Sequence, residues 1–286
     1  MIDTVCCRER SDRRLSVDIW GRLQLRRAYT TTTTTTTKLP RVSEYDERMS
    51  ASTTRSAVEE APSTANPPID VSIVIPARNE AAYLRGGLSS ITALDTDYEY
   101  EVIVVDGAST DDTRAIAREY NATVVEEDGS SIAVARNLGA SHADGEWLVF
   151  IDADTRVQAD YLTEMLGFVE REGLAAASSR CRMTGPLRAK LMEGTINQLF
   201  PRLASPVLPG FNCVVHHRAF DEVGGFPDVP NEDTAFSRRL GRQYPTAYHP
   251  DILVTSSGRR IAADGLTGTL WHYLRLDAGR LQSSRS

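Results

Sequence analysis

The stretch WLVFIDADT, residues 147–155, places two carboxylates one residue apart directly after an uninterrupted apolar run. An apolar run of this length is typical of a fully buried β-strand. At the end of such a strand Asp152 and Asp154 would repel each other, and burial would penalise both charges further. A counter-charge, a raised pKa or full exposure to water is therefore needed at this point of the chain.

Three further apolar runs precede this stretch and alternate with segments of helical spacing. The predicted strands are VSIVIP (71–76), EVIVVD (101–106) and ATVVEE (122–127), and the predicted helices are 79–91 with Asn79 as N-cap, 109–120 and 130–143. Continuous apolar strands that alternate with helices predict an α/β fold with a mostly parallel sheet and helices on both faces. Ligands bind at the carboxyl ends of the strands in such sheets, where Asp106 and Asp152 lie.

The pattern becomes less regular after a helix at 158–172, which Gly173 is expected to end. Strands are predicted at 174–183, 211–217 and 252–260, and helices at 186–200, 229–244 and 264–276. We expect residues 70–157 to form the ligand-binding half of one domain, and residues 158–286 to form its second half with a C-terminal helix.

Residues 1–69 differ in composition from the rest of the chain. They include eight consecutive threonines (30–37) and a segment rich in Ser, Thr, Ala and Pro, with few residues that could form a core. This composition predicts a disordered, low-complexity segment. We also expect Met49 to be the true start of the protein, which the intact mass of the natively expressed chain would test.

Composition excludes several classes of protein. The formal net charge of −7 and the absence of a basic run with interleaved aromatic residues argue against nucleic-acid binding. The four cysteines form no C-x-x-C pair, and no run of about 18 apolar residues exists, so a reduced, cytoplasmic chain without a spanning helix is expected. Any contact with a membrane would be peripheral, at its inner face.

Asp152 and Asp154 point to the same side if strand geometry continues past the apolar run. Two parallel carboxylates supply part of a site for a divalent cation, Mn or Mg, whose remaining ligands are usually water and substrate phosphates. The alternative is a solvated acidic loop, because two acids at this spacing are common. Their position at the end of a core strand, with Asp106 ending another, favours the metal site.

Four motifs, in order, resemble the family 2 glycosyltransferases of the GT-A fold. They are VSIVIPARNE, VVDGASTDDT, ARNLGASHADGEWLVFIDADT and GGFPDVPNEDTAFSRRL, and the resemblance covers roughly residues 70–260. It implies an inverting enzyme with a GT-A-type sheet, in which residues 70–157 form the nucleotide-sugar-binding half and residues 158–286 the acceptor half. Such an enzyme moves a sugar from a nucleotide-diphospho-sugar to a hydroxyl or phosphate of a glycan or lipid-linked acceptor, with a divalent metal.

The resemblance implies roles for residues on the donor side. The loop after the first strand would hold the nucleoside, Asp106 would accept the imide N–H of the base, Arg136 would pack near the base, and Arg259 and Arg260 would bind the diphosphate. Asp152 and Asp154 would hold the metal and, through it, the donor. The loop residues are Pro76, Ala77, Arg78 and Glu80. A turn-capping role for Asp106 and solvated positions for the three arginines are the structural alternatives.

On the acceptor side, Glu232 and Asp233 match the acidic pair of the family, and Asp233 is the predicted base. Asn231 as N-cap would put both acids in the first turn of a helix, where the helix dipole favours ionised carboxylates. Ordinary acidic capping of a helix is the alternative interpretation.

Other functions and contacts stay open at this point. A nucleotidyltransferase or a non-catalytic nucleotide-sugar-binding scaffold would share the fold, whereas a Rossmann dehydrogenase lacks support because no G-x-G-x-x-G follows the first strand. The apolar segments 199–208 and 264–276 can contact a membrane that carries a lipid-linked acceptor, but core packing is the better explanation for both.

Overall fold

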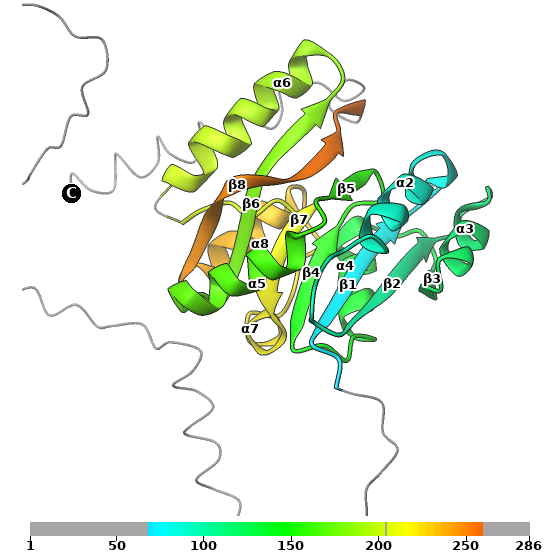
Figure 1. The fold of residues 1–286 in the computed structure, drawn as a ribbon, viewed down its shortest axis with the longest axis horizontal. Coiled ribbons are helices and arrows are strands. Elements are labelled where there is room, and N and C mark those ends of the chain that lie inside the picture. Colours follow the sequence, from blue (N-terminus) through cyan, green and yellow to red (C-terminus); the bar gives the residue numbers. More distant parts are fainter. Residues whose placement is uncertain (1–67, 204, 260–286) are drawn as a thin grey trace, which may run out of the picture. The chain divides into compact units, whose positions relative to one another are not determined.

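The central feature of this protein, in a computed structural model that describes residues 68–203 and 205–259, is an eight-stranded sheet. The strand order is β3-β2-β1-β4-β7-β6-β8-β5 (Figure 1). Strands β3, β2, β1 and β4 run parallel to one another, and β7 pairs antiparallel with both β4 and β6. The predicted α/β class with a mostly parallel sheet is therefore confirmed, because four of the seven strand pairs are parallel.

The elements follow the predicted alternation closely in the first half of the chain. The strands are β1 (Val71–Ala77), β2 (Tyr100–Gly107), β3 (Thr123–Glu127), β4 (Trp147–Ile151), β5 (Thr155–Val157), β6 (Ala176–Thr184), β7 (Asn212–His216) and β8 (Thr246–Ser257). The helices are α2 (Ala81–Ile91), α3 (Thr113–Glu119), α4 (Ile132–Ala140), α5 (Tyr161–Glu172), α6 (Leu187–Gly194), α7 (His217–Glu222) and α8 (Glu232–Leu240), with a π-helical turn η1 (Thr195–Leu199) and a 3-10 turn η2 (Phe200–Arg202) after α6.

Alternate side chains of the central strands enter two different cores. In β1, Ile73 and Ile75 pack into the core on the side of α2, α3 and α5, whereas Val74 packs into the core on the side of α4, α7 and α8. In β4, Val149 and Phe150 divide between the same two cores. Because both faces of these strands are covered, their sequences are continuously apolar rather than alternating.

The order of the strands reverses next to β1. The chain runs outward from β1 to β2 and β3, and then returns to place β4 on the other side of β1. The register puts Ala77 opposite Asp106, and the DADT segment follows β4 at the same edge of the sheet. A crevice opens at such a switch point, so the predicted site residues converge there.

Several local predictions needed correction. Helix α2 begins at Ala81 rather than after Asn79, because Asn79 takes a left-handed conformation (φ 54°) and its side-chain oxygen accepts the N–H of Thr110. Strand β8 begins at Thr246, six residues before the expected start, and neither β5 nor α7 was predicted. The predicted end of α5 is confirmed, because Gly173 lies at the C-cap with φ 62°.

Predictions about the two ends of the chain fall largely outside the described residues. These are the disordered segment 1–69, the start at Met49, the C-terminal helix at 264–276 and the role of Arg260. The division into halves at residue 157 stays a prediction, and one sheet runs through both halves because β5 pairs with β8. In the segment 199–208, Phe200, Val207 and Leu208 are buried, as core packing requires.

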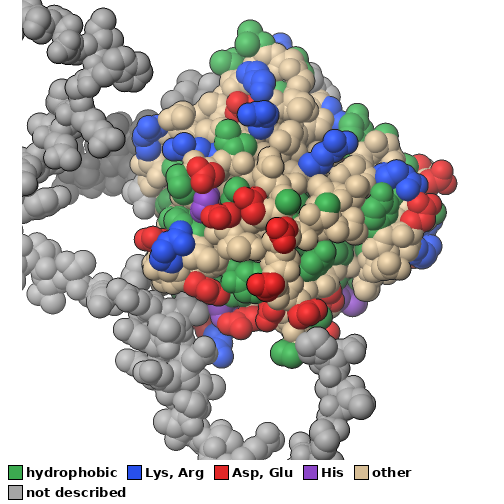
Figure 2. Space-filling view, viewed as in Figure 1, with side chains coloured by type: hydrophobic (Ala, Val, Ile, Leu, Met, Phe, Trp, Pro, Cys, Tyr) green, Lys and Arg blue, Asp and Glu red, His purple; other side chains and the backbone are tan. Residues whose placement is uncertain are grey.

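The surface is unevenly charged. In the face seen in Figure 2, Lys and Arg side chains gather toward the top, over α6, and acidic side chains toward the lower edge. Within residues 68–259, as far as they are described, no helix has the length and apolar character needed to cross a bilayer.

The contact between α4 and the sheet depends on a glycine. A Cβ at Gly139 would lie 2.3 Å from Val74 Cγ1 and 3.0 Å from Val105 Cγ2. We therefore expect Gly139→Ala to lower the free energy of unfolding by about 1–3 kcal/mol, because an overpacked core has to shift. Urea denaturation measures this change.

Gly167 on α5 provides the matched control, since a Cβ there meets nothing within 4 Å. Gly167→Ala is expected to raise stability by up to about 1 kcal/mol through helix propensity alone. Equal effects of the two substitutions would contradict the close packing of α4 on the sheet.

Candidate active site

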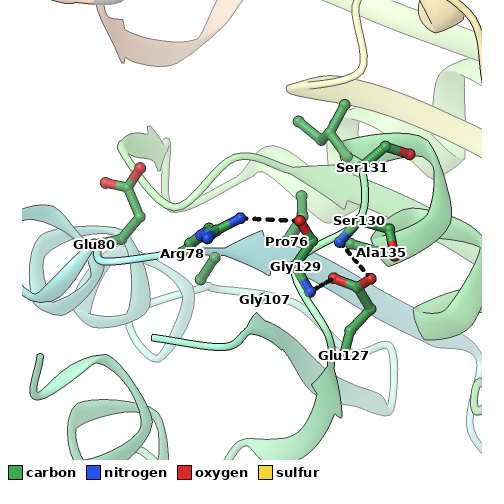
Figure 3. A pocket seen from close by; sticks show the side chains of 11 residues that line it. Pro76, Arg78, Glu80, Gly107, Glu127, Gly129, Ser130, Ser131 and Ala135 are labelled. Carbon is green, nitrogen blue, oxygen red and sulfur yellow. Dashed lines mark hydrogen bonds between the residues drawn. The ribbon is translucent and has the colours of Figure 1, made fainter. Parts of the chain in front are cut away.

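A pocket lies at the switch point, between the loop after β1 and the segment that joins β3 to α4 (Figure 3). All four residues predicted in the first loop line it. The lining residues are Pro76, Ala77, Arg78, Glu80, Gly107, Glu127, Gly129, Ser130, Ser131, Ile132 and Ala135.

The side of the pocket formed by the turn after β3 escaped the sequence prediction. Glu127 accepts the N–H groups of Gly129 and Ser130, both at 2.8 Å, and Arg78 Nη1 donates to the carbonyl of Gly129 at 2.9 Å (Figure 3). Gly129 has φ 85°, and a Cβ there would lie 2.8 Å from the Arg78 guanidinium. The sequence EEDGS signals a turn, but the pairing of this turn with Arg78 depends on the fold.

Asp106 lies at the end of β2 and is completely buried. Its Oδ2 accepts the N–H of Ser109 at 3.1 Å and lies 3.6 Å from Arg114 Nε, which matches the turn-capping alternative. Its Oδ1 is buried without a hydrogen-bond partner among the described residues. Asp106 does not line the pocket, but the adjacent Gly107 does.

Arg136 on α4 connects the acids after β4 with the acids at the start of α8. Its Nη2 donates to Asp152 Oδ1 at 3.0 Å, and its Nη1 donates to Glu232 Oε1 at 2.7 Å. The side chain is 3% exposed and lies over the Phe226 ring, 5.2 Å from its centroid. Burial alone would lower the pKa of Arg136, but the carboxylates of Asp152 and Glu232 raise it above its usual value. Arg136 is therefore a buried, permanent cation, contrary to the solvated alternative.

A second arginine has the same relation to Asp154. Arg259 donates through Nε to Asp154 Oδ2 at 3.1 Å and through Nη2 to Glu80 Oε2. Its guanidinium lies over the Tyr83 ring, 4.0 Å from the centroid. Asp152 and Asp154 thus receive the counter-charges that they require from two arginines in different parts of the chain, Arg136 and Arg259.

Asp233, the predicted base, begins α8 beside Glu232. Burial raises the pKa of Asp233 to about 6, and the neighbouring Glu232 carboxylate acts in the same direction, whereas Arg136 and the N–H of Thr234 lower it. Asn231 is the N-cap residue as expected, with φ 56°. The helix dipole was expected to favour the ionised acid, but desolvation and the adjacent like charge outweigh it.

The donor chemistry of this region fits a divalent cation held together with a diphosphate. Asp152 and Asp154 offer carboxylate oxygens, which Mg and Mn prefer, and the Asp152 side chain is 13% exposed. In the described part of the chain no group of three or more His, Cys, Asp or Glu residues gathers in a metal-binding arrangement. A cation here would need substrate and water oxygens, as Mg sites commonly do.

One continuous series of contacts connects the predicted site residues. Glu80 lines the pocket and bonds Arg259, which bonds Asp154. Asp152, two residues earlier, bonds Arg136, which bonds Glu232 next to Asp233. The structure thus brings the pocket, the two acids after β4 and the acidic pair of α8 into one site.

The comparisons with known proteins agree with this arrangement. The family model described as "Glycosyl transferase family 2" matches residues 72–224, which is more than half of the chain. The chain therefore belongs to glycosyl transferase family 2, and the family resemblance seen in its motifs is confirmed.

Individual proteins also resemble this chain, at low sequence identity. Glycosyltransferase AglE of Haloferax volcanii is 26% identical over 183 residues, which cover 59% of this chain and 60% of AglE. The crystal structure of Staphylococcus aureus TarS 1–349 superposes with a TM-score of 0.57 at 20% identity, covering 66% of this chain and 61% of that one. The likeness to TarS confirms the GT-A-type fold.

A third similar protein is the mannosyltransferase PcManGT from Pyrobaculum calidifontis, solved in complex with GDP-Man and Mn2+. Its TM-score is 0.55 at 25% identity, and the match covers 75% of this chain and 63% of PcManGT. The chain thus spans less than two thirds of the length of each of these three proteins.

Arg136 is expected to be essential for the stability of this site. Arg136→Met would leave the carboxylates of Asp152 and Glu232 without their shared counter-charge, which costs about 3–5 kcal/mol for a buried pair. Urea denaturation at neutral pH measures the change.

Arg85→Met is the control, because Arg85 and its partner Glu119 are both about half exposed. An exposed pair contributes little, so this substitution should leave stability nearly unchanged. A wild-type free energy of unfolding in Arg136→Met would contradict the role assigned to the buried cation.

Proposed function

We propose that this protein is an inverting glycosyltransferase. It moves a sugar from a nucleotide-diphospho-sugar to a hydroxyl or phosphate of a glycan or lipid-linked acceptor, by direct displacement at the anomeric carbon. The observation that carries the proposal is the double ion pair of Arg136, which joins Asp152 on the donor side to Glu232 beside the proposed base. Family membership and the complex of PcManGT with GDP-Man support this assignment.

The pocket at the switch point is proposed to hold the nucleoside. The base would lie on Gly107 next to Asp106, whose buried Oδ1 lacks a donor that an imide N–H can supply. Arg78 is exposed at the rim of the pocket, where a guanidinium suits phosphate oxygens. Uracil, thymine and guanine all carry a suitable N–H, so the base stays open.

Asp152 and Asp154 are proposed to hold a divalent metal, in line with the Mn2+ bound by PcManGT. When bound, the metal would neutralise charge on the leaving diphosphate. Arg136 pairs with Asp152 and Arg259 pairs with Asp154, which holds the two carboxylates in place. Arg259 is also proposed to bind the diphosphate, because a guanidinium that bridges two acids can exchange one of them for a phosphate oxygen.

Asp233 is proposed to take the proton of the acceptor. A pKa of about 6 leaves the carboxylate mostly ionised at neutral pH, while keeping it a stronger base than an ordinary aspartate. Arg136 neutralises the adjacent Glu232, which limits the rise of the pKa of Asp233. A base of this kind removes the proton as the acceptor oxygen attacks the sugar.

Thermal unfolding with nucleoside diphosphates tests the donor site. We expect the melting temperature to rise with one of UDP, GDP, dTDP or CDP, and to rise more in the presence of Mn, because ligands that bind the native state stabilise it. Asp154→Asn is expected to weaken the Mn-dependent affinity at least about tenfold through loss of a ligand charge.

Asp97→Asn, at an exposed position, is the matched control and should bind as the wild type does. Unchanged affinity of Asp154→Asn in the presence of Mn would remove Asp154 from the metal site. Release of pyrophosphate from the donor, instead of nucleoside diphosphate, would identify a nucleotidyltransferase. Donor binding without transfer to any acceptor would favour a non-catalytic scaffold.

Asp233→Asn tests the base. We expect kcat to fall about 100-fold or more while the affinity for the donor stays within about threefold, because the variant loses only the proton acceptor. In the wild-type enzyme, transfer should decrease as the pH falls through about 6, where Asp233 becomes protonated. Initial rates across a pH series measure both effects.

The stability of the same variant gives an independent reading. Because the pKa of Asp233 is raised from 3.8, the favourable contribution of the protonated acid is lost as the pH rises through about 6. Asp233→Asn should therefore be more stable than the wild type at pH values above 7. The substitution Asp228→Asn, at an exposed position nearby, is the control for stability.

For the kinetic test, a loss of donor affinity in Asp233→Asn as large as its loss of rate would contradict the assignment of Asp233 as the base.

A further inference from the structure

Helix α6 and the turns after it carry an unusual row of exposed leucines. Leu187 is 77% exposed, Leu191 58% and Leu199 37%. These are three of the six large hydrophobic side chains that are exposed within the described residues. The spacing of four residues puts Leu187 and Leu191 on one side of α6, and Leu199 ends the turn η1 that directly follows α6.

The opposite side of the same segment is also apolar. Ala189, Ile196 and Phe200 are buried against the core. Apolar side chains thus lie on two sides of this segment, although only one side packs on the core. An exposed row of large apolar side chains is typical of a surface that a further partner covers.

Cations surround this row. Arg182, Arg188, Lys190 and Arg202 are exposed on or beside α6, and the segment from 182 to 203 contains a single acid, Glu193, which pairs with Lys190 at 2.9 Å. Figure 2 shows several Lys and Arg side chains over α6 at the top of the view. In a chain with a formal net charge of −7, this patch is a local exception.

The charges decide between the possible partners. In a symmetric dimer built on this row the same four cations of both copies would face each other, which is unfavourable. Residues 260–286 also carry an excess of positive charge, with four arginines against two aspartates. A surface with apolar depth and negative charge complements the patch, as the headgroup region of an anionic bilayer does.

We propose that α6 and its flanking turns dock this protein on an anionic membrane surface. Leu187, Leu191 and Leu199 enter the headgroup region, and the surrounding arginines and lysine bind the lipid phosphates. The contact is peripheral and needs no spanning helix. Most of this surface lies before the segment 199–208, whose sequence suggested membrane contact, and only Leu199 and Arg202 belong to that segment.

The proposed membrane surface borders the site. A Cβ at Gly258 would lie 2.2 Å from Ala189 Cβ, and the Gly258 N–H donates to the carbonyl of Thr184, so α6 packs directly on the end of β8. The next residue, Arg259, bonds Asp154 and Glu80. A protein docked through α6 therefore holds this edge of its site close to lipids, which suits a lipid-linked acceptor.

Sedimentation of the full chain with lipid vesicles tests the proposal. We expect the protein to sediment with vesicles of phosphatidylglycerol and phosphatidylcholine in equal parts, and to stay in solution with pure phosphatidylcholine. Two double variants should each lower the partition coefficient between vesicles and solution at least about tenfold. One combines Leu187→Ser and Leu191→Ser, and the other combines Arg188→Glu and Lys190→Glu. The assay needs neither donor nor acceptor, so its result does not depend on the proposed function.

Matched controls exist for both double variants. Val229 and Ile252 are exposed apolar residues elsewhere, and Arg118 and Arg171 are exposed arginines on α3 and α5. Replacing Val229 and Ile252 by Ser, or Arg118 and Arg171 by Glu, should leave vesicle binding within about twofold of the wild type. These residues lie outside the patch. Unchanged melting temperatures confirm that all variants fold.

Three results would overturn the proposal. The first is that the wild type does not sediment with the anionic vesicles, and the second is that the α6 variants sediment as the wild type does. The third is that sedimentation velocity finds a dimer that becomes monomeric when Leu187 and Leu191 are replaced, which would identify a second copy of the chain as the partner.

Discussion

A buried arginine that is shared by two carboxylates is the constraint on which this site depends. Arg136 has lost nearly all contact with water, and its pairs with Asp152 and Glu232 compensate for that loss. The protein makes room for it, because a Cβ at Gly210 would lie 2.4 Å from the guanidinium, and it fixes α4 through the close contact of Gly139 with Val74. Strand β4 and helix α8 are therefore held together by charge as well as by apolar packing, and the position of one acidic pair determines that of the other.

Much of the fold could be predicted because its central strands are buried on both faces. A strand such as Val71–Ala77, with every residue buried, has a sequence that few other elements produce. The convergence of Ala77, Asp106 and Asp152 at one edge follows from parallel pairing alone. The irregular half was harder: the three-residue β5 gives too short a pattern, and the start of β8 contains a proline and several polar residues that hide the strand.

The partners of the site residues could not be predicted from local sequence. Arg136 reaches Glu232 across 96 positions, and Arg259 reaches Glu80 across 179. Such pairs depend on how helices pack, and a surface arginine has the same sequence signature as a buried one. The pKa of Asp233 is another case: its position in a first helical turn suggested an easily ionised acid, but desolvation beside Glu232 has the opposite effect and is larger. The sequence around Glu127 and Gly129 indicates a turn, but it does not indicate that this turn contacts Arg78.

The anchoring of Arg259 places the last described residues of the chain beside the site. Residue 259 is held by Asp154 and Glu80, and Gly258 is held against α6, so residue 259 lies at the rim of the site. A segment inserted directly after Arg259 would be tethered within a few residues of Asp154. A short tether gives effective concentrations in the millimolar range. A peptide, carrier domain or sugar-binding module inserted there would therefore compete for the site as an intramolecular ligand, whereas the same module inserted directly before β1 would begin at the opposite edge of the sheet.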